Sequence, residues 1–246
     1  MPARHLAPAG YYFEAVHHPV EAPDLVQVAM REVAEGARWV KLVADFPSAA
    51  ARASASPVPE PTYDLTVVRE LVTATHDAGA RIAAHVTTEL AADLVRLGID
   101  SIEHGTALDQ DTLAEMARRG TAWTPTLCAA LLVRPDAPEV RQRLVAERRE
   151  RMRELLPMAV RLGLPVLTGS DVVGSVPREI ALLVECGLDP VDALRASTES
   201  AMRFLGADGA DAQPSVVTFD QDPREDPAVL ARPAAIVIGG VRVRVR

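Results

Sequence analysis

The stretch GARIAAH, residues 79–85, contains the pattern that decides the fold. An amphipathic run typical of a helix precedes it, and its glycine stands where that helix should end. A short apolar run typical of a strand follows, and a polar residue closes it. Glycine directly after a helix adopts the left-handed conformation that terminates it. The same order recurs five times, in GARWVKLV (36–43), GARIAAH (79–85), GIDSIEH (98–104), GTAWTPT (120–126) and GLPVLTGSD (163–171).

Helices that alternate with strands through short connections indicate a parallel β-sheet with crossover helices. Five consecutive units favour a (β/α) barrel of the TIM type. A doubly wound open sheet is the alternative. It is disfavoured because no glycine-rich phosphate-binding turn follows any of the predicted strands. The sequence therefore predicts an α/β fold.

Polar residues occupy the position where a barrel places its active site, the carboxyl ends of the strands. Lys41 lies five residues after its glycine, and His85 and His104 each lie six residues after theirs. Asp171 ends the last of the five stretches. Because the predicted strands are parallel, we expect these four side chains to converge at one end of the barrel.

Lys41 is the only lysine of the chain, and the other 25 of its 26 basic residues are arginines. It lies in an apolar run, where an ammonium group is costly to desolvate. Arginine cannot replace an amine that must lose its proton, either to form an imine or to be carboxylated by carbon dioxide. We therefore predict a chemical role for Lys41. The alternative is a strand-end lysine whose ammonium group simply reaches solvent.

Two imidazoles, a carboxylate and a lysine have the donor types of a metal site if the lysine is carboxylated, because a carbamate supplies oxygen ligands that can bridge two ions. Nitrogen and oxygen donors of this kind suit zinc, manganese, iron or nickel, with zinc the default. We predict one or two divalent ions, zinc, held by Lys41, His85, His104 and Asp171. The metal would activate water, and Asp171 would take its proton and pass it to the leaving group. The implied reaction is hydrolysis of an amide, lactam or lactone.

The composition limits the class of protein. A chain of 246 residues, 48% of them hydrophobic, can bury the core of one α/β domain or of two smaller ones. The net charge of -8 argues against nucleic acid or an anionic membrane as partner and leaves a small-molecule substrate. No apolar run has membrane-spanning length, and residues 1–20 lack a signal-peptide core. We expect a cytoplasmic protein, provided that Met1 is the true start.

Two regions lie outside the repeat. Residues 44–61, rich in Ala, Ser and Pro, are predicted to form a loop over the mouth of the barrel. After Gly206, apolar runs flank the pair Gly239-Gly240 and predict a small β appendage with a hairpin. We place the domains at residues 1–205, the barrel, and 206–246, the C-terminal β segment.

Four stretches resemble barrel strands of the amidohydrolase superfamily, especially its imidazolonepropionase-like and Xaa-Pro dipeptidase-like members. They are WVKLV (39–43) for the fourth strand, RIAAHVTTE (81–89) for the fifth, DSIEHGT (100–106) for the sixth and PVLTGSD (165–171) for the eighth. The resemblance continues through residues 187–206 and 216–243, the latter being similar to the family's accessory β-sandwich.

The resemblance implies a metal-dependent hydrolase of carbon–nitrogen bonds, acting on a cyclic amide, an amide or a dipeptide-like substrate. It implies that Lys41 is a carbamylated lysine that bridges the metals. It implies that His85 and His104 bind one metal, and that Asp171 binds the other and shuttles the proton.

The chain departs from this family at the first strand, which carries a His-x-His pair for the more buried metal. The sequence contains no His-x-His. RHLAPAG (4–10) looks like the end of the third strand, so we expect an incomplete barrel of roughly strands three or four to eight. We favour truncation over degeneration or completion by another chain, because the remaining ligands are intact. The expected consequences are impaired hydrolysis and an open sheet edge that favours a homo-oligomer.

Several interpretations compete with these. Lys41 as the Schiff-base nucleophile of an aldolase-like barrel leaves two histidines and an aspartate unexplained. A non-catalytic pseudoenzyme or fragment is the other alternative. By strand alternation Glu103 is predicted to point away from the site, toward a helix. Asp171 has the alternative role of capping the helix after Gly174. His17 and His18 are predicted to lie in a loop.

Overall fold

The computed structural model describes residues 4–53, 57–207 and 215–243. The chain divides into two compact units, residues 1–124 and residues 125–246. The domain boundary that we place at residue 206 from the sequence stays a prediction.

The first unit is built around a six-stranded sheet with the order β2-β1-β3-β6-β7-β8. All of its strand pairs are parallel. The predicted α/β fold with parallel strands is therefore confirmed. The elements are β1 His5–Ala7, β2 His17–Pro19, η1 Ala22–Asp24, α1 Leu25–Ala34, β3 Trp39–Val43, β4 Asp45–Phe46, η2 Ala51–Ala53, β5 Glu60–Pro61, α2 Leu65–Asp77, β6 Arg81–Val86, α3 Leu90–Leu97, β7 Ser101–His104, α4 Gln110–Arg119 and β8 Ala122–Thr124.

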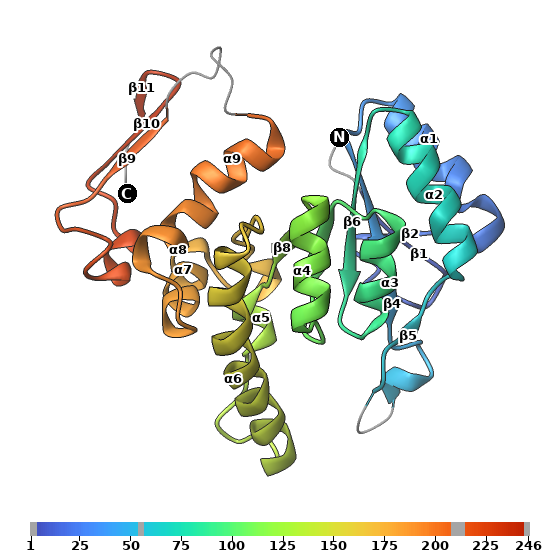
Figure 1. Ribbon diagram of the computed structural model, residues 1–246, viewed down its shortest axis with the longest axis horizontal. Coiled ribbons are helices and arrows are strands. Elements are labelled where there is room, and N and C mark those ends of the chain that lie inside the picture. The colour runs from blue at the N-terminus through green and yellow to red at the C-terminus, as the bar shows by residue number, and fades with distance from the viewer. Residues whose placement is uncertain (1–3, 54–56, 208–214, 244–246) are drawn as a thin grey trace. The chain divides into compact units, whose positions relative to one another are not determined.

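Helices α1 to α4 follow one another beside the sheet, and each contacts the next (Figure 1). α1 also contacts β3, and α2 contacts β6. On the sheet, alternate residues such as Leu42, Ile82 and Ile102 are completely buried. The hydrophobic core of this unit therefore lies between the helices and one face of the sheet.

The strand register decides which polar side chains share the other face. Lys41 pairs with Ala83, and Ala83 pairs with Ser101. His85 pairs with Glu103, two residues further along the same strands. Because side chains alternate along a strand, Lys41, His85, Ser101 and Glu103 all belong to the face opposite the helix-covered core.

The five glycines of the repeat end their helices as predicted. Gly98 and Gly120 are the C-caps of α3 and α4, with φ of 100° and 74°. Gly36, Gly79 and Gly163 also have positive φ, between 73° and 103°. Glycine adopts this conformation without the steric cost that a Cβ would add.

One strand of the sheet was not predicted. His17 and His18 lie in β2, which pairs in parallel with β1, and the prediction that they lie in a loop is wrong. β2 has three residues, too few to show the alternation by which a strand is recognised in sequence. β1, by contrast, confirms the strand predicted within residues 4–10.

The second unit is mainly helical, and α6 is its longest element (Figure 1). Its elements are α5 Leu127–Ala130, α6 Glu139–Arg161, η3 Asp171–Val173, α7 Val176–Glu185, α8 Pro190–Ser197, α9 Glu199–Leu205, β9 Val216–Thr218, η4 Pro227–Ala231, β10 Ala235–Ile238 and β11 Val241–Val243.

The fifth stretch of the repeat forms very little strand. Between residues 163 and 171 a single residue, Val166, makes a bridge, and Asp171 already begins η3. The N–H of Thr168 donates to the carbonyl of Ala196 at 3.2 Å instead of joining a strand ladder. The predicted strand is therefore reduced here to one bridge residue.

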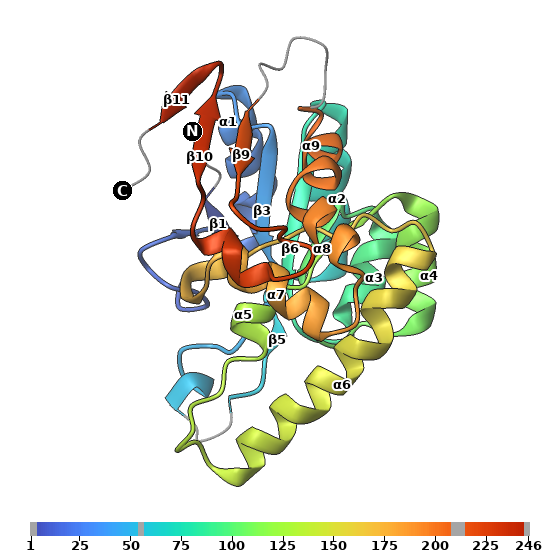
Figure 2. The same ribbon diagram turned by 90° about the vertical axis from the view of Figure 1, so that its left-hand side faces the viewer.

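The C-terminal strands form a separate antiparallel sheet with the order β11-β10-β9 (Figure 2). Gly239 and Gly240, with φ of 55° and 79°, connect β10 to β11 and confirm the predicted hairpin. Among the described helices, none is both long and apolar enough to span a membrane.

Candidate active site

His85 lies near the end of β6 and exposes 8% of its surface. Its ring centroid is 4.4 Å from that of His104 and 5.6 Å from those of Tyr12 and Phe46. Its Nδ1 is buried and has no hydrogen-bond partner within the described part of the chain. Leaving a buried polar atom unsatisfied costs about 1 to 3 kcal/mol. A bound ligand would remove that cost, which makes Nδ1 a candidate metal donor.

The surroundings of His85 favour its neutral form. Burial holds the pKa of His85 well below its ordinary value, and electrostatic interactions with His104, Lys41 and His5 act in the same direction. A neutral imidazole is the form that binds a metal ion. Lys41 and His104 are thus close enough to His85 to influence its charge.

His104 reaches His85 because the backbone leaves the strand conformation at this residue. Its φ is 69°, in the left-handed region that residues other than glycine seldom adopt. The indole nitrogen of Trp123 donates a hydrogen bond to the carbonyl oxygen of His104 at 3.0 Å. Regular alternation would have turned His104 away from the face that carries Glu103, so the irregular φ accounts for the histidine pair.

Glu103 does not point toward a helix, and that prediction is wrong. Its Oε2 lies 3.6 Å from Nζ of Lys41, and its Oε1 accepts a hydrogen bond of 2.7 Å from the hydroxyl of Ser101. The strand alternation of β7 is regular up to Glu103 and breaks only at His104. Glu103 is therefore an acidic residue of the site face.

Asp45 is a residue that the sequence analysis did not single out. It is completely buried in β4, and its carboxylate accepts hydrogen bonds from Thr87 and Thr88, the residues that follow β6. The backbone N–H groups of both threonines donate at 2.8 to 2.9 Å, and the two hydroxyls at 3.0 and 2.6 Å. Asp45 therefore fixes the loop that leaves the strand of His85.

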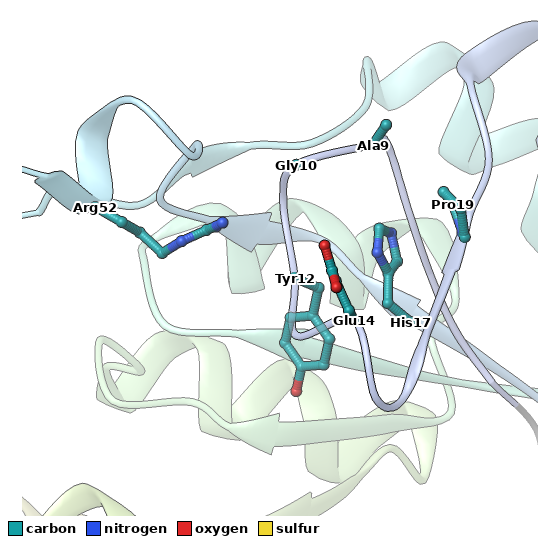
Figure 3. A pocket seen from close by; sticks show the side chains of 7 residues that line it. All are labelled: Ala9, Gly10, Tyr12, Glu14, His17, Pro19 and Arg52. Carbon is teal, nitrogen blue, oxygen red and sulfur yellow. The ribbon is translucent and has the colours of Figure 1, made fainter.

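The first unit contains a cavity of about 340 Å³, and His17 is the histidine among its lining residues (Figure 3). The ring of Tyr12 forms part of its wall and contacts both His5 and His85. The lining combines an aromatic ring with cationic, anionic and imidazole groups. The lining residues are Ala9, Gly10, Tyr12, Glu14, His17, Pro19 and Arg52.

Asp171 belongs to the second unit. Its φ is 51°, and its carboxylate accepts the N–H of Val172 at 2.7 Å. Ser175, and not Asp171, caps α7, because the Ser175 side chain accepts the N–H of Arg178. The alternative of Asp171 as the cap of that helix is therefore wrong. The predicted place of Asp171 beside the histidines stays a prediction.

Glu179 is a buried acid of the second unit that sequence reasoning missed. Its two carboxylate oxygens accept the N–H groups of Leu127 and Cys128 at 2.7 and 2.8 Å. Burial raises its pKa, although these two hydrogen bonds act in the opposite direction. Its contacts fix the start of α5, which is a structural role.

Among the described residues, no group of three His, Cys, Asp or Glu side chains has the spacing of a metal site. What the first unit brings together is the imidazole pair of His85 and His104, with Lys41 and Glu103 on the same face. A metal site here would need a donor that Lys41 gains by carboxylation, or one from elsewhere.

The comparisons with known proteins decide the family. The model of the Amidohydrolase family matches residues 3–243. The chain belongs to the amidohydrolase family. Uncharacterized proteins of Mycobacterium tuberculosis and Mycobacterium bovis are each 33% identical to this amidohydrolase over 253 residues. The match covers 96% of this chain and 66% of each relative, so this amidohydrolase spans about two thirds of their length.

Solved structures confirm the expected fold, that of the TIM-like barrel of amidohydrolases. A prolidase in complex with N-methylphosphonate-L-proline is 24% identical, with a TM-score of 0.78 over 99% of this chain and 68% of that chain. A Xaa-Pro dipeptidase with methionine bound in its active site is 21% identical, with a TM-score of 0.76 over 98% of this chain and 66% of that chain. At these identities the likeness concerns the fold.

Proposed function

We propose that this amidohydrolase is a metal-dependent hydrolase of carbon–nitrogen bonds in cyclic amides, amides or dipeptide-like substrates. The observation that carries the proposal is the pair His85 and His104, whose rings are 4.4 Å apart and of which His85 has a buried Nδ1 without a partner among the described residues. Family membership supports the hydrolase class.

The donors fit a divalent ion, with zinc the default. His85 and His104 would supply imidazole nitrogen, and Lys41 would supply carbamate oxygen after its amine adds carbon dioxide and releases a proton. Asp171 is proposed to complete the set. A bound ion would act as a Lewis acid that activates water at neutral pH.

The chain's own residues would then perform the remaining tasks. The carboxylate of Asp171 would accept a proton from the attacking water and return it to the leaving nitrogen. Tyr12 lines the cavity and its ring centroid lies 5.6 Å from that of His85, which supports the proposal that the cavity would receive part of a substrate. The net charge of -8 favours a small-molecule substrate over a nucleic acid.

The substrate class rests on the relatives of known structure. One is a prolidase bound to a phosphonate analogue that contains proline, and another is a Xaa-Pro dipeptidase. We therefore propose Xaa-Pro dipeptides and related amides as the first compounds to test. We expect slow turnover by the 246-residue chain, because it contains no His-x-His to hold a second ion.

Zinc binding tests the proposal directly. The purified chain is loaded with zinc in bicarbonate buffer, and the bound metal is measured by mass spectrometry. We expect His85→Ala to weaken zinc binding by about tenfold or more, since it removes a ligand. His76→Ala is the matched control, because His76 lies on α2, is 40% exposed and pairs with Asp100, the residue before β7. Equal zinc binding by wild type and His85→Ala would contradict the proposal.

Activity is measured on a panel of Xaa-Pro dipeptides, N-acyl amino acids, lactams and lactones. Slow, zinc-dependent hydrolysis of at least one amide is the expected result. Robust turnover by this chain would contradict the predicted impairment, whereas metal binding without turnover would favour the non-catalytic alternative.

One observation favours that second candidate, a pseudoenzyme or fragment that associates with another copy. Among the described residues, no three metal-binding acids, cysteines or histidines come together. A chain that binds no zinc and forms an oligomer in light scattering would support it. The aldolase alternative gains nothing from the geometry, since a Schiff-base lysine gives no role to the pair of His85 and His104.

A further inference from the structure

The side chain of Lys41 is directed across the sheet toward β7. Lys41 lies on β3, and its Nζ is 3.6 Å from Oε2 of Glu103. Strand β6 lies between β3 and β7. The side chains of Lys41 and Glu103 are 17% and 21% exposed, so the pair is largely shielded from solvent. The lysine therefore crosses the intervening strand to reach its partner.

The residue that Lys41 crosses is small. Its register partner on β6 is Ala83, whose methyl group leaves room above the strand for an extended lysine. Two residues along β6 on the same face lies His85. The path of the lysine therefore leads from β3 past the strand that carries the buried imidazole.

The carboxylate of Glu103 is itself held in place. Its second oxygen accepts a hydrogen bond of 2.7 Å from the hydroxyl of Ser101 on the same strand. Glu103 is also the register partner of His85 on the neighbouring strand. One oxygen thus faces Ser101 and the other faces Lys41, beside the histidine.

We propose that Glu103 is a positioning residue that draws Lys41 across β6 toward His85 and His104, and that Ser101 orients Glu103 for this task. A lysine has four rotatable carbon–carbon bonds and otherwise extends its ammonium group into water. The ion pair selects one of these conformations. The importance of this placement for metal binding rests on the proposed function, whereas the placement itself does not.

The chain offers a direct readout, because Lys41 is its only lysine. Protein produced with lysine labelled with carbon-13 at Cε gives a single side-chain signal in the NMR spectrum. In wild type we expect a signal shifted from that of free lysine, with two distinct Hε protons, as for an ordered side chain. In Glu103→Gln we expect a narrower signal and a smaller difference between the two Hε protons, because Lys41 loses a partner that restricts its conformation.

Glu115→Gln is the matched control, because Glu115 is also an ion-paired glutamate but pairs with arginines on α4. Its Lys41 signal should equal that of wild type. Ser101→Ala, a smaller change, should give a signal between the two extremes and carries the test if Glu103→Gln does not fold. An unchanged Lys41 signal in folded Glu103→Gln, or in Ser101→Ala if it alone folds, overturns the proposal.

Zinc titration separates this proposal from the proposed function. If both hold, Glu103→Gln binds zinc about 10 to 100 times more weakly than wild type, as when a residue that orients a ligand is removed. Glu115→Gln should bind zinc as wild type does. A wild type that binds no zinc contradicts the metal-dependent function, while the Lys41 signal still decides the role of Glu103.

Discussion

Gly105 directly follows His104, and its surroundings leave no room for a side chain. Its φ is 58°, and a Cβ would lie 2.6 Å from Cδ1 of Leu108 and 2.9 Å from the indole nitrogen of Trp123. Gly105→Ala should therefore destabilise the chain by about 2 to 4 kcal/mol, from overpacking and from the left-handed conformation. The free energy of unfolding in urea measures this loss.

Gly79 provides the control for that substitution. It has a similar φ of 73°, but nothing lies within 4 Å of the position of a Cβ. Gly79→Ala should cost about 1 to 2 kcal/mol, from conformation alone. Equal losses of unfolding free energy in the two variants would mean that the close packing around Gly105, next to His104, adds nothing to the conformational cost.

Cys128 makes the stability of the chain depend on pH in the alkaline range. Burial raises the pKa of its thiol to about 11, and the hydrogen bond to Glu179 and the charge of that carboxylate act in the same direction. An unfolded chain releases the proton near pH 9, so folding favours the protonated thiol. This contribution is complete below about pH 9 and is lost as pH rises toward about 11.

We therefore expect the free energy of unfolding of wild type to fall more steeply between pH 9 and 11 than that of Cys128→Ala. The difference between the two curves isolates Cys128, because Cys186 is present in both proteins. Parallel curves across this range would show that the thiol does not titrate differently in the folded state.

At single residues, sequence reasoning succeeded where the strand pattern is regular and failed where it breaks. The positions of Lys41 and His85 follow from counting along the strands, and both belong to the predicted face. Glu103 was assigned to the wrong face because His104 was assumed to continue the alternation. His104 has a left-handed φ, and its carbonyl accepts a hydrogen bond from Trp123, 19 residues away, which no local sequence pattern indicates.

At the scale of elements, the short strand β4 is coupled to the end of β6 through Asp45. Asp45→Ala would leave the N–H groups of Thr87 and Thr88 without their acceptor in a half-buried loop. We expect a loss of about 2 to 5 kcal/mol in the free energy of unfolding, because each unsatisfied donor costs about 1 to 3 kcal/mol.

Asp93→Ala is the control for Asp45→Ala. Asp93 forms an exposed ion pair with Arg96 on α3, and such pairs contribute at most about 1 kcal/mol. Urea denaturation measures the free energy of unfolding of both variants, and Asp45→Ala should lose more than Asp93→Ala. A loss below about 1 kcal/mol for Asp45→Ala would show that water replaces the carboxylate and that the loop after His85 is not fixed by it.

The elements themselves were largely predictable, for a physical reason. A glycine that must adopt positive φ marks a helix end, and four of the five marked units contain the expected strand. The fifth contains one bridge residue, because Thr168 donates to Ala196 instead of to a strand. β2 escaped prediction since three residues show no period. The Asp45 interaction escaped it because its partners are more than 40 residues away.

At the scale of the molecule, composition limited the class of protein, and the repeated order of helix, glycine and strand predicted the fold that the family resemblance also implies. None of these predicted the cavity. The cavity is lined by residues between Ala9 and Pro19 and by Arg52, which come together only when the chain is folded. Composition also indicates Lys41, because a chain that uses arginine everywhere else keeps one amine. Glu103, which pairs with that amine, is recognised as its partner only from the strand register and the folded structure.

Zinc should stabilise the whole chain if Asp171 and the histidines bind the same metal. Ligand that binds only the folded state adds about 2.7 kcal/mol at one hundred times its Kd. We therefore expect zinc to raise the melting temperature and a chelator to reverse the increase.

Asp171→Asn should lose most of this increase, although Asp171 belongs to the second unit and His85 and His104 belong to the first. Asp192→Asn should retain it, because Asp192 pairs with Arg195 on α8. If Asp171→Asn gains as much from zinc as wild type does, Asp171 is not a ligand, and its proposed part in catalysis would be limited to proton transfer.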